Sequence, residues 1–179
     1  MNYLNQLNYE ESTDDARDLY DQIKKKIGMI PNLYKHVAHS PHALKGILSF
    51  DDSLNRGTFS KAEVQAIDLV TAQENGCQYC LAAHTTIAKK LGFSEEETFH
   101  LRTATIDDST LNALTGLAKE ILTTKGYPSD YHIEKFFSAG YDKAALVELI
   151  GHISKNIFKN YINHISDTEI DFPKAKKLH

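Results

Sequence analysis

Both cysteines of the chain lie in one short segment, "NGCQYCLAAH", together with a histidine. Cys77, Cys80 and His84 are separated by three and then four residues, so on an α-helix they would lie along one face. Gly76 precedes this group, and we expect a helix to begin directly after it. The unpaired N–H groups and the positive dipole at a helix N-terminus favour a thiolate. Cys-X-X-Cys pairs in such positions have a lowered pKa, and the thiolate is the nucleophile.

Three interpretations of this spacing remain open. Redox chemistry is the first, because three residues along a helix bring two sulfurs close enough for a disulfide after a small adjustment, while His84 could accept the thiol proton. A zinc site is the second, but with 2 cysteines in the chain only a Cys₂His site with an open position is conceivable. Burial of both cysteines for packing alone is the third. We favour the redox interpretation and expect neither a metal nor a cofactor.

Composition excludes several other classes of protein. The chain has 179 residues, 41% hydrophobic and 25% charged, which is typical of one globular domain. A net charge of −4 with scattered Lys and Arg gives no basis for binding nucleic acid. No apolar run approaches the roughly 20 residues of a membrane-spanning helix, and the first residues lack the pattern of a signal peptide. We therefore expect a cytoplasmic protein, in a compartment that keeps thiols reduced.

The elements that must position these residues are predicted to be helices almost throughout. The segment 12–28 begins with Ser12 as a candidate N-cap and ends at Gly28. The helix before the cysteines opens with Ser60 and Glu63, a capping box, and carries apolar residues at helical spacing. Strand-like alternation is absent, so the sequence predicts an all-α fold of roughly eight or nine helices. We expect a single domain over residues 1–179, with the redox core at about 40–125.

The other histidines carry less information. His36, His39 and His42 are spaced by three residues, but Ser40-Pro41 interrupts the helix between the last two. We therefore expect these histidines to be surface residues rather than a shared metal site. His152 lies in the last long helical segment, and the sequence assigns no role to it.

Four segments resemble one known family. "NGCQYCLAAH" resembles the core motif of the AhpD-like (alkylhydroperoxidase D-like) proteins of the carboxymuconolactone decarboxylase superfamily, and "SKAEVQAIDLVTAQ" resembles the helix that precedes this motif. "GMIPNLYKHVAHSPHALKGILSF" is similar to the N-terminal segment of the peroxidase-related branch, and "AGYDKAALVELIGHISKNIFKNYINHISDTEIDFP" to its C-terminal segment. The resemblance covers nearly the whole chain, and the cysteine motif is its most specific part.

The resemblance implies an all-α homo-oligomer, often a trimer or hexamer, with thiol peroxidase or disulfide reductase activity and no haem, flavin or metal. By this match Cys80 would attack the peroxide and become a sulfenic acid. Cys77 would then form a disulfide with it, and a reductant protein or small dithiol would reduce that disulfide. His84 matches the family histidine that relays the proton.

The chain departs from the family at one position of the proton relay. The relay usually includes a glutamate twelve residues before the first cysteine, and here that position is Gln65, which cannot act as a base. Asp68 lies one turn further along the same helix face and is the candidate substitute. The absence of the glutamate puts the efficiency of a peroxidase in question, because loss of a general base costs about 10²–10⁴-fold in rate.

The sequence thus predicts a thiol-dependent peroxidase or disulfide oxidoreductase that acts on hydroperoxides in antioxidant defence. Two alternatives remain. One is a decarboxylase-like enzyme of the superfamily that makes no use of the cysteine pair, in which activity would survive a double Cys→Ser change. The other is a non-catalytic oligomeric stress-response module, which would form normal oligomers and consume no peroxide.

Overall fold

The computed structural model describes residues 3–178. Within them the chain forms a short 3₁₀ turn, Tyr9–Glu11, and nine α-helices without any strand, which confirms the predicted all-α class. The helices are Asp14–Ile27 (α1), Asn32–Val37 (α2), Pro41–Leu54 (α3), Lys61–Glu74 (α4), Gln78–Lys90 (α5), Glu95–Thr103 (α6), Ser109–Thr123 (α7), Asp130–Ser138 (α8) and Lys143–Ser166 (α9). None of the described helices is long and apolar enough to cross a membrane.

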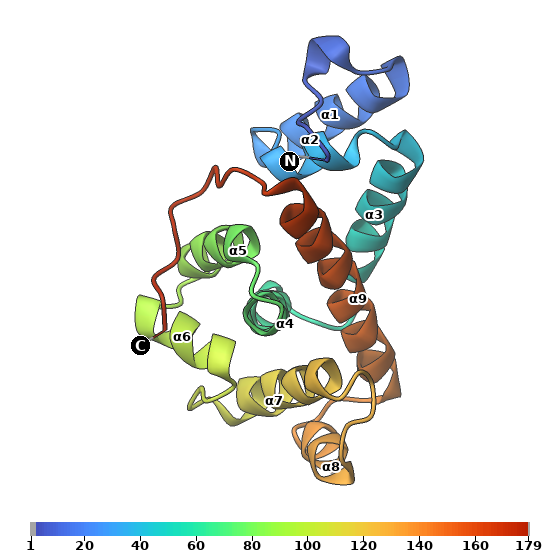
Figure 1. Ribbon diagram of the computed structural model, residues 1–179. Coiled ribbons are helices and arrows are strands. Elements are labelled where there is room, and N and C mark those ends of the chain that lie inside the picture. Colours follow the sequence, from blue (N-terminus) through green and yellow to red (C-terminus); the bar gives the residue numbers. More distant parts are fainter. Residues whose placement is uncertain (1–2, 179) are drawn as a thin grey trace.

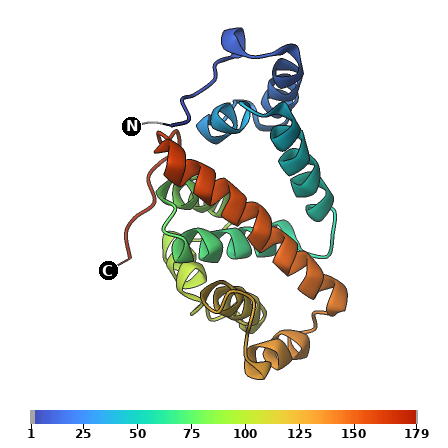
Figure 2. The same ribbon diagram turned by 45° about the vertical axis from the view of Figure 1, so that its right-hand side comes forward.

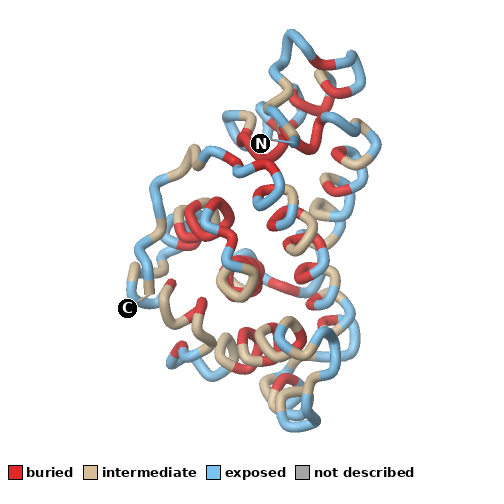
Figure 3. Tube along the Cα trace, in the orientation of Figure 1, coloured by how far each residue is buried: buried red, intermediate tan, exposed pale blue. Residues whose placement is uncertain are grey.

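Helix α4 lies at the centre of the structure, and α5, α6, α7 and α9 surround it (Figure 1). Every residue of α4 from 64 to 72 is buried, which is typical of a helix enclosed on all sides (Figure 3). Its Ala66, Leu69 and Ala72 face an apolar cluster that extends to α1, α2, α3 and α5. On the other side Ile67 and Val70 pack into a second cluster formed with α7, α8 and α9. The two clusters therefore meet along one central helix.

Helix α9 spans the molecule and crosses α4 (Figure 2). Its 24 residues correspond to a length of about 36 Å. The helix also packs against α2 and α3, and it is the main connection between the N-terminal helices and the rest of the fold. Residues on its inner face are consequently placed beside α4 and α5.

The segment after α9 runs back along α5 towards α6 (Figure 1). Several contacts hold it. The Asp171 carboxylate accepts the backbone N–H of Asn32 at 2.8 Å, and the Arg102 guanidinium donates to the backbone carbonyl of Lys176 at 2.8 Å. The Tyr79 ring of α5 also contacts Phe172 edge to face. This segment therefore covers α5 near its first turn.

Helix starts were predicted well, with one exception. The Ser60–Glu63 capping box is present, with Ser60 N–H to Glu63 at 2.8 Å and Glu63 N–H to Ser60 at 3.3 Å. Gly28 ends α1 with a φ of 90°, which favours glycine. The N-cap of α1, however, is Thr13 and not Ser12. The Ser12 hydroxyl instead donates to the carbonyl of Asn8 at 2.7 Å, so it stabilises the preceding 3₁₀ turn.

The expectation that His36 is a surface residue was wrong, whereas His39 and His42 are exposed. His36 is only 2% exposed. Helix α2 packs against α3 and α9, and the N-terminal segment lies along it through a hydrogen bond from Leu7 N–H to the Lys35 carbonyl. The burial of His36 is set by these distant segments, which a local polar pattern does not reveal.

His152 generates a prediction about stability in acid. It is fully buried beside Phe59, both ring nitrogens are without a hydrogen-bond partner, and burial lowers its pKa from 6.5 to about 4. The folded state thus excludes a proton that the unfolded chain binds below about pH 6.5, so stability falls as the pH drops from 6.5 towards 4. The wild type should lose free energy of unfolding between pH 7.5 and pH 5, and the loss should be about 2 kcal/mol smaller in His152→Phe. Urea unfolding at the two pH values measures this. His42→Phe is the exposed control, and equal pH dependence of both variants and the wild type would contradict the assignment.

Candidate active site

Cys77 is the N-cap of α5, as the sequence predicts. Its sulfur accepts the backbone N–H of Cys80 at 3.3 Å, so a thiol takes the role that Ser or Asp has at most helix starts. Both cysteines are free, and both are buried, with 0% exposure for Cys77 and 3% for Cys80. The sulfurs therefore lie at the positive end of a helix dipole with little screening by water.

Helix α9 supplies further hydrogen-bond donors to the sulfurs. The side-chain amide of Asn160 donates to Cys80 Sγ at 2.9 Å. The amide of Asn163 donates to Cys80 Sγ at 3.2 Å and also lies 3.7 Å from Cys77 Sγ. The interpretation of the cysteines as apolar packing residues does not fit these contacts, because both sulfurs are surrounded by polar donors.

The orientation of these amides has an energetic cost. Asn163 Oδ1 is buried without a partner, and so is Oδ1 of Asn156, whose Nδ2 donates to Asp68. An unsatisfied buried acceptor costs about 1–3 kcal/mol. The two side chains are therefore poorly suited to stabilising the fold and well suited to presenting N–H groups to the sulfurs and to a carboxylate.

The two thiols differ in acidity. A hydrogen bond from Cys80 lowers the pKa of Cys77 against the opposing effect of burial, and the backbone N–H of Cys80 and the Asn163 and Asn160 amides lower it further. The pKa of Cys80 is raised, because Cys80 gives its hydrogen bond to Cys77 and is itself buried. Of the two thiols, Cys77 is consequently the one that loses its proton more readily.

Gln65 and Asp68, the two relay candidates of α4, both contact the same ring nitrogen of His84. His84 Nδ1 lies 2.9 Å from Gln65 Oε1 and 3.4 Å from Asp68 Oδ2. Because an amide oxygen only accepts, this contact assigns the proton to Nδ1 and leaves Nε2 as the basic nitrogen. Burial lowers the pKa of His84, which Asp68 opposes only in part, so the imidazole is neutral at pH 7. Gln65 therefore orients the ring, while Asp68 supplies the negative charge.

Asp68 belongs to a buried ionic cluster that the sequence did not reveal. Lys155 Nζ is 2.6 Å from Asp51 and 4.0 Å from Asp68, and Lys159 is 3.4 Å from Asp51. Burial would raise the pKa of Asp68, but Lys155, then His84, Lys159 and the Asn156 amide outweigh it and lower the pKa. Asp68 is thus held as a carboxylate although it is only 2% exposed.

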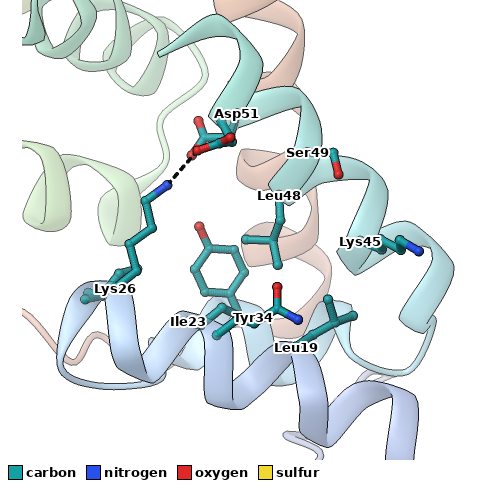
Figure 4. A pocket seen from close by; sticks show the side chains of 11 residues that line it. Leu19, Ile23, Lys26, Tyr34, Lys45, Leu48, Ser49 and Asp51 are labelled. Atoms are coloured by element: carbon teal, nitrogen blue, oxygen red, sulfur yellow. Dashed lines mark hydrogen bonds and ion pairs between the residues drawn. The ribbon is translucent and has the colours of Figure 1, made fainter. Parts of the chain in front are cut away.

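The cluster reaches the surface at Asp51. This residue lines a cavity of about 410 Å³ between α1, α2 and α3, together with Tyr34, Leu19 and Ile23 (Figure 4). The hydroxyl of Tyr34 points towards the end of the cavity that holds Asp51 (Figure 4). A second cavity of about 270 Å³ has Gln65 in its wall and shares Lys26 with the first cavity.

Sequence reasoning singled out Cys77, Cys80, His84, Gln65 and Asp68. The structure joins Cys77 to Cys80 at the start of α5 and, separately, joins Gln65 and Asp68 of α4 to His84, which follows Cys80 by one helical turn. Sequence reasoning missed the five polar residues of α9, namely Lys155, Asn156, Lys159, Asn160 and Asn163. A signal for them exists, because the asparagines are four and three residues apart and so share one face of a helix. Within residues 3–178 no group of three or more His, Cys, Asp or Glu side chains is arranged to hold a metal ion.

Comparison with known proteins places this site in context. The model of the Carboxymuconolactone decarboxylase family matches residues 41–122, which includes the cysteine motif and ends before α9. No curated protein sequence matches the chain. Several solved structures resemble it. An uncharacterized peroxidase-related protein from Ralstonia eutropha JMP134, described as an alkylhydroperoxidase AhpD core, has a TM-score of 0.83 at 17% identity, with 93% of this chain and 90% of that chain covered.

Two further structures share the fold. A peroxidase-related protein from Silicibacter sp. TM1040 has a TM-score of 0.75 at 19% identity, over 88% of this chain and 85% of that chain. The debrominase Bmp8, in a variant bound to 2,3,4-tribromopyrrole, has a TM-score of 0.79 at 15% identity, over 94% of this chain and 91% of that chain. The architecture is therefore that of the AhpD-like helical proteins. The family model, which matches residues 41–122, supports the resemblance to the AhpD-like proteins of the carboxymuconolactone decarboxylase superfamily.

The amide donors give a prediction for the reactivity of the thiols. Asn163→Leu removes a hydrogen bond to both sulfurs without leaving a cavity, so the apparent pKa of the reactive thiol should rise by about one unit. Alkylation by iodoacetamide against pH measures this, and Asn55→Leu, an exposed site with the same change, is the control. The melting temperature of Asn163→Leu should be unchanged or higher, since the orphaned Oδ1 is also removed. An unaltered alkylation profile would refute the role of the amide.

Proposed function

We propose that the protein is a thiol-dependent peroxidase that reduces hydroperoxides through Cys80 and Cys77. The observation that carries the proposal is the shared donor: one amide, that of Asn163, reaches both sulfurs of a reduced Cys-X-X-Cys pair at a helix N-terminus. This arrangement stabilises negative charge on either sulfur, as a pair that alternates between dithiol and disulfide requires.

The proposed reaction begins at Cys80. Because the pKa of Cys80 is raised, its thiol needs a base, and His84 lies one turn further along α5. His84 Nε2 accepts the thiol proton as Cys80 Sγ attacks the peroxide, and it returns the proton to the departing alkoxide. Cys80 becomes a sulfenic acid and the hydroperoxide becomes an alcohol.

Cys77 completes the oxidative half of the cycle. Its thiolate attacks the sulfenic sulfur of Cys80, the S–O bond breaks, and hydroxide leaves as water after protonation. The product is a Cys77–Cys80 disulfide. Asp68 acts as a positioning residue in this scheme, because its carboxylate stabilises the imidazolium that His84 forms transiently.

The cavity beside Gln65 supports an organic hydroperoxide as the substrate. One part of its wall is apolar, with Phe59, Val64, Ile87 and Leu91, and Ile87 is 38% exposed; Lys26, Asn55 and Lys61 form the polar part. Ile87 and Leu91 continue the line of Cys80 and His84 along one face of α5. The apolar part of a hydroperoxide would be held by these side chains, close to the residue that orients His84.

Mass spectrometry tests the function directly. Treatment of the reduced protein with cumene hydroperoxide should remove two hydrogen atoms and link Cys77 to Cys80 in a peptide map, and dithiothreitol should reverse the change. Cys77→Ser should stop at a sulfenic acid, and Cys80→Ser should not consume peroxide at all. An unchanged dithiol mass in the wild type would exclude the proposed reaction.

A rescue experiment tests the proton relay. Asp68→Asn should lower kcat/KM for cumene hydroperoxide about 10²-fold, because the transient imidazolium loses its carboxylate. Gln65→Glu in the same chain should restore most of the loss, since position 65 contacts the same ring nitrogen. Circular dichroism and the melting temperature check that each variant folds. Failure of the glutamate to rescue, with both proteins folded, would leave Asp68 with a structural role only.

Assembly into a trimer or hexamer stays a prediction. Helix α9 exposes several large apolar side chains that another copy of the chain could cover, namely Val147, Ile150, Tyr161 and Ile165. Light scattering of the purified protein measures the number of copies.

A further inference from the structure

One residue of the cysteine pair lies in the wall of a pocket. The pocket has a volume of about 340 Å³ and is bounded by the first turn of α5, the last turn of α9 and the segment that follows α9. Cys77 is part of its wall, whereas Cys80 is not. The other described wall residues that matter here are Gln78, Tyr79, Asn163, His164, Asp167 and Thr168. Neither His84 nor Gln65 lines this pocket, so it is separate from the cavity beside Gln65.

Two wall side chains carry polar atoms that the fold leaves unused. Asn163 and Thr168 are 4% and 8% exposed, and Asn163 Oδ1 and Thr168 Oγ1 are both without a hydrogen-bond partner. Buried groups of this kind are normally satisfied by protein or by a bound molecule. Both residues line the same pocket as Cys77, which marks it as a place for a polar ligand.

The charge of the pocket restricts that ligand. Asp167, at the C-cap of α9, contributes a carboxylate, and the described wall residues include no Lys or Arg. The negative dipole end of α9 and the positive dipole end of α5 both border the pocket and oppose one another, so the Asp167 carboxylate is the remaining charge. A neutral or cationic molecule is therefore favoured over an anionic one.

We propose that this pocket is a thiol-exchange port, at which a compact reductant thiol without negative substituents attacks Cys77 of the oxidised pair. The inference rests on the proposed function, in that the Cys77–Cys80 disulfide is the species to be reduced. It assigns a docking site and a chemical class to the reductant, and it assigns one of the two sulfurs as the point of attack.

The exchange balances in two steps. The reductant thiolate forms a bond to Cys77 Sγ, the Cys77–Cys80 bond breaks, and Cys80 leaves as a thiolate with the bonding electrons. A second thiol of the reductant then attacks the reductant sulfur of the mixed disulfide, which releases the Cys77 thiolate. Two electrons pass to the protein, the reductant becomes a disulfide, and its two protons are left for the cysteine pair.

The surroundings of Cys80 support this direction of attack. The leaving sulfur in a thiol exchange must carry negative charge, and Cys80 Sγ accepts amide N–H groups at 2.9 Å from Asn160 and 3.2 Å from Asn163. An approach to Cys80 itself would have to pass these two side chains. Cys77 lines the pocket, so attack from there avoids Asn160 and meets only the Asn163 amide, 3.7 Å from Cys77 Sγ.

The first test uses the disulfide made with diamide, which does not depend on peroxide. We expect cysteamine to reduce it faster than 2-mercaptoethanol, and 2-mercaptoethanol faster than thioglycolate, by about two- to fivefold each after correction for the thiolate fraction of each reagent. In Asp167→Asn, the rates of reduction by the three thiols should differ much less from one another. Rates that are independent of reagent charge in both proteins would overturn the assignment.

The second test closes the port. His164→Trp should slow reduction by 2-mercaptoethanol about tenfold and leave oxidation by diamide unchanged, whereas Ile165→Trp, on the adjacent exposed position, should alter neither. With 2-hydroxyethyl disulfide, Cys80→Ser should form a mixed disulfide at Cys77 at least tenfold faster than Cys77→Ser forms one at Cys80. Equal rates in either comparison would refute the port.

The outcomes separate the port from the peroxidase. One outcome is that the reduction rates follow the charge of the thiol and His164→Trp slows reduction, while no hydroperoxide is consumed. In that case the port is supported and the proposed peroxidase activity is wrong. If peroxide forms the disulfide but neither port variant alters its reduction, the port is wrong and the peroxidase stands. A disulfide that forms with neither diamide nor peroxide would overturn both.

Discussion

A buried polar group needs a partner, and in this structure most partners of the buried sulfurs and of Asp68 come from one helix. The sulfurs of Cys77 and Cys80 and the carboxylate of Asp68 are removed from water, and α9 provides the N–H groups and ammonium groups that they lack. Burial of an isolated carboxylate is very unfavourable. The position of α9 across α4 is therefore the constraint on which the chemistry of the site depends.

The same constraint explains why the site has a polar interior between two apolar clusters. Helix α4 packs with apolar side chains on both sides, yet it carries Gln65 and Asp68 at buried positions. These two residues are one turn apart and meet His84 of α5 at a single nitrogen. The Gln65 amide holds the imidazole in one tautomer, and the Asp68 carboxylate keeps a negative charge beside it. Neither side chain alone does both.

The cysteine pair is asymmetric for a physical reason. Cys77 caps α5 and faces a polar pocket, whereas Cys80 lies behind it under two asparagine amides. Charge on Cys77 is favoured in the reduced pair, and charge on Cys80 becomes favoured once Cys77 is bonded to another sulfur. Two sulfurs in one helical turn thus have different surroundings and can take different roles in the proposed reaction.

The sequence by itself determined the local features of this protein. Helix caps such as Ser60 and Glu63, the all-α class, and the alignment of Cys77, Cys80 and His84 on one helix face follow from spacings of a few residues. Such features depend on hydrogen bonds within a turn or two, and they are therefore encoded locally.

Only the tertiary structure decided which residues serve the site from a distance. Asn160 and Asn163 are 80 and 83 residues away from Cys80, and Lys155 reaches Asp51 across 104 positions. His36 resembles a surface residue in the sequence and is buried by segments before and after it. Which polar side chain is enclosed, and by what, depends on the packing of helices far apart in the chain, because the free energy of a buried charge is set by all of its neighbours in space.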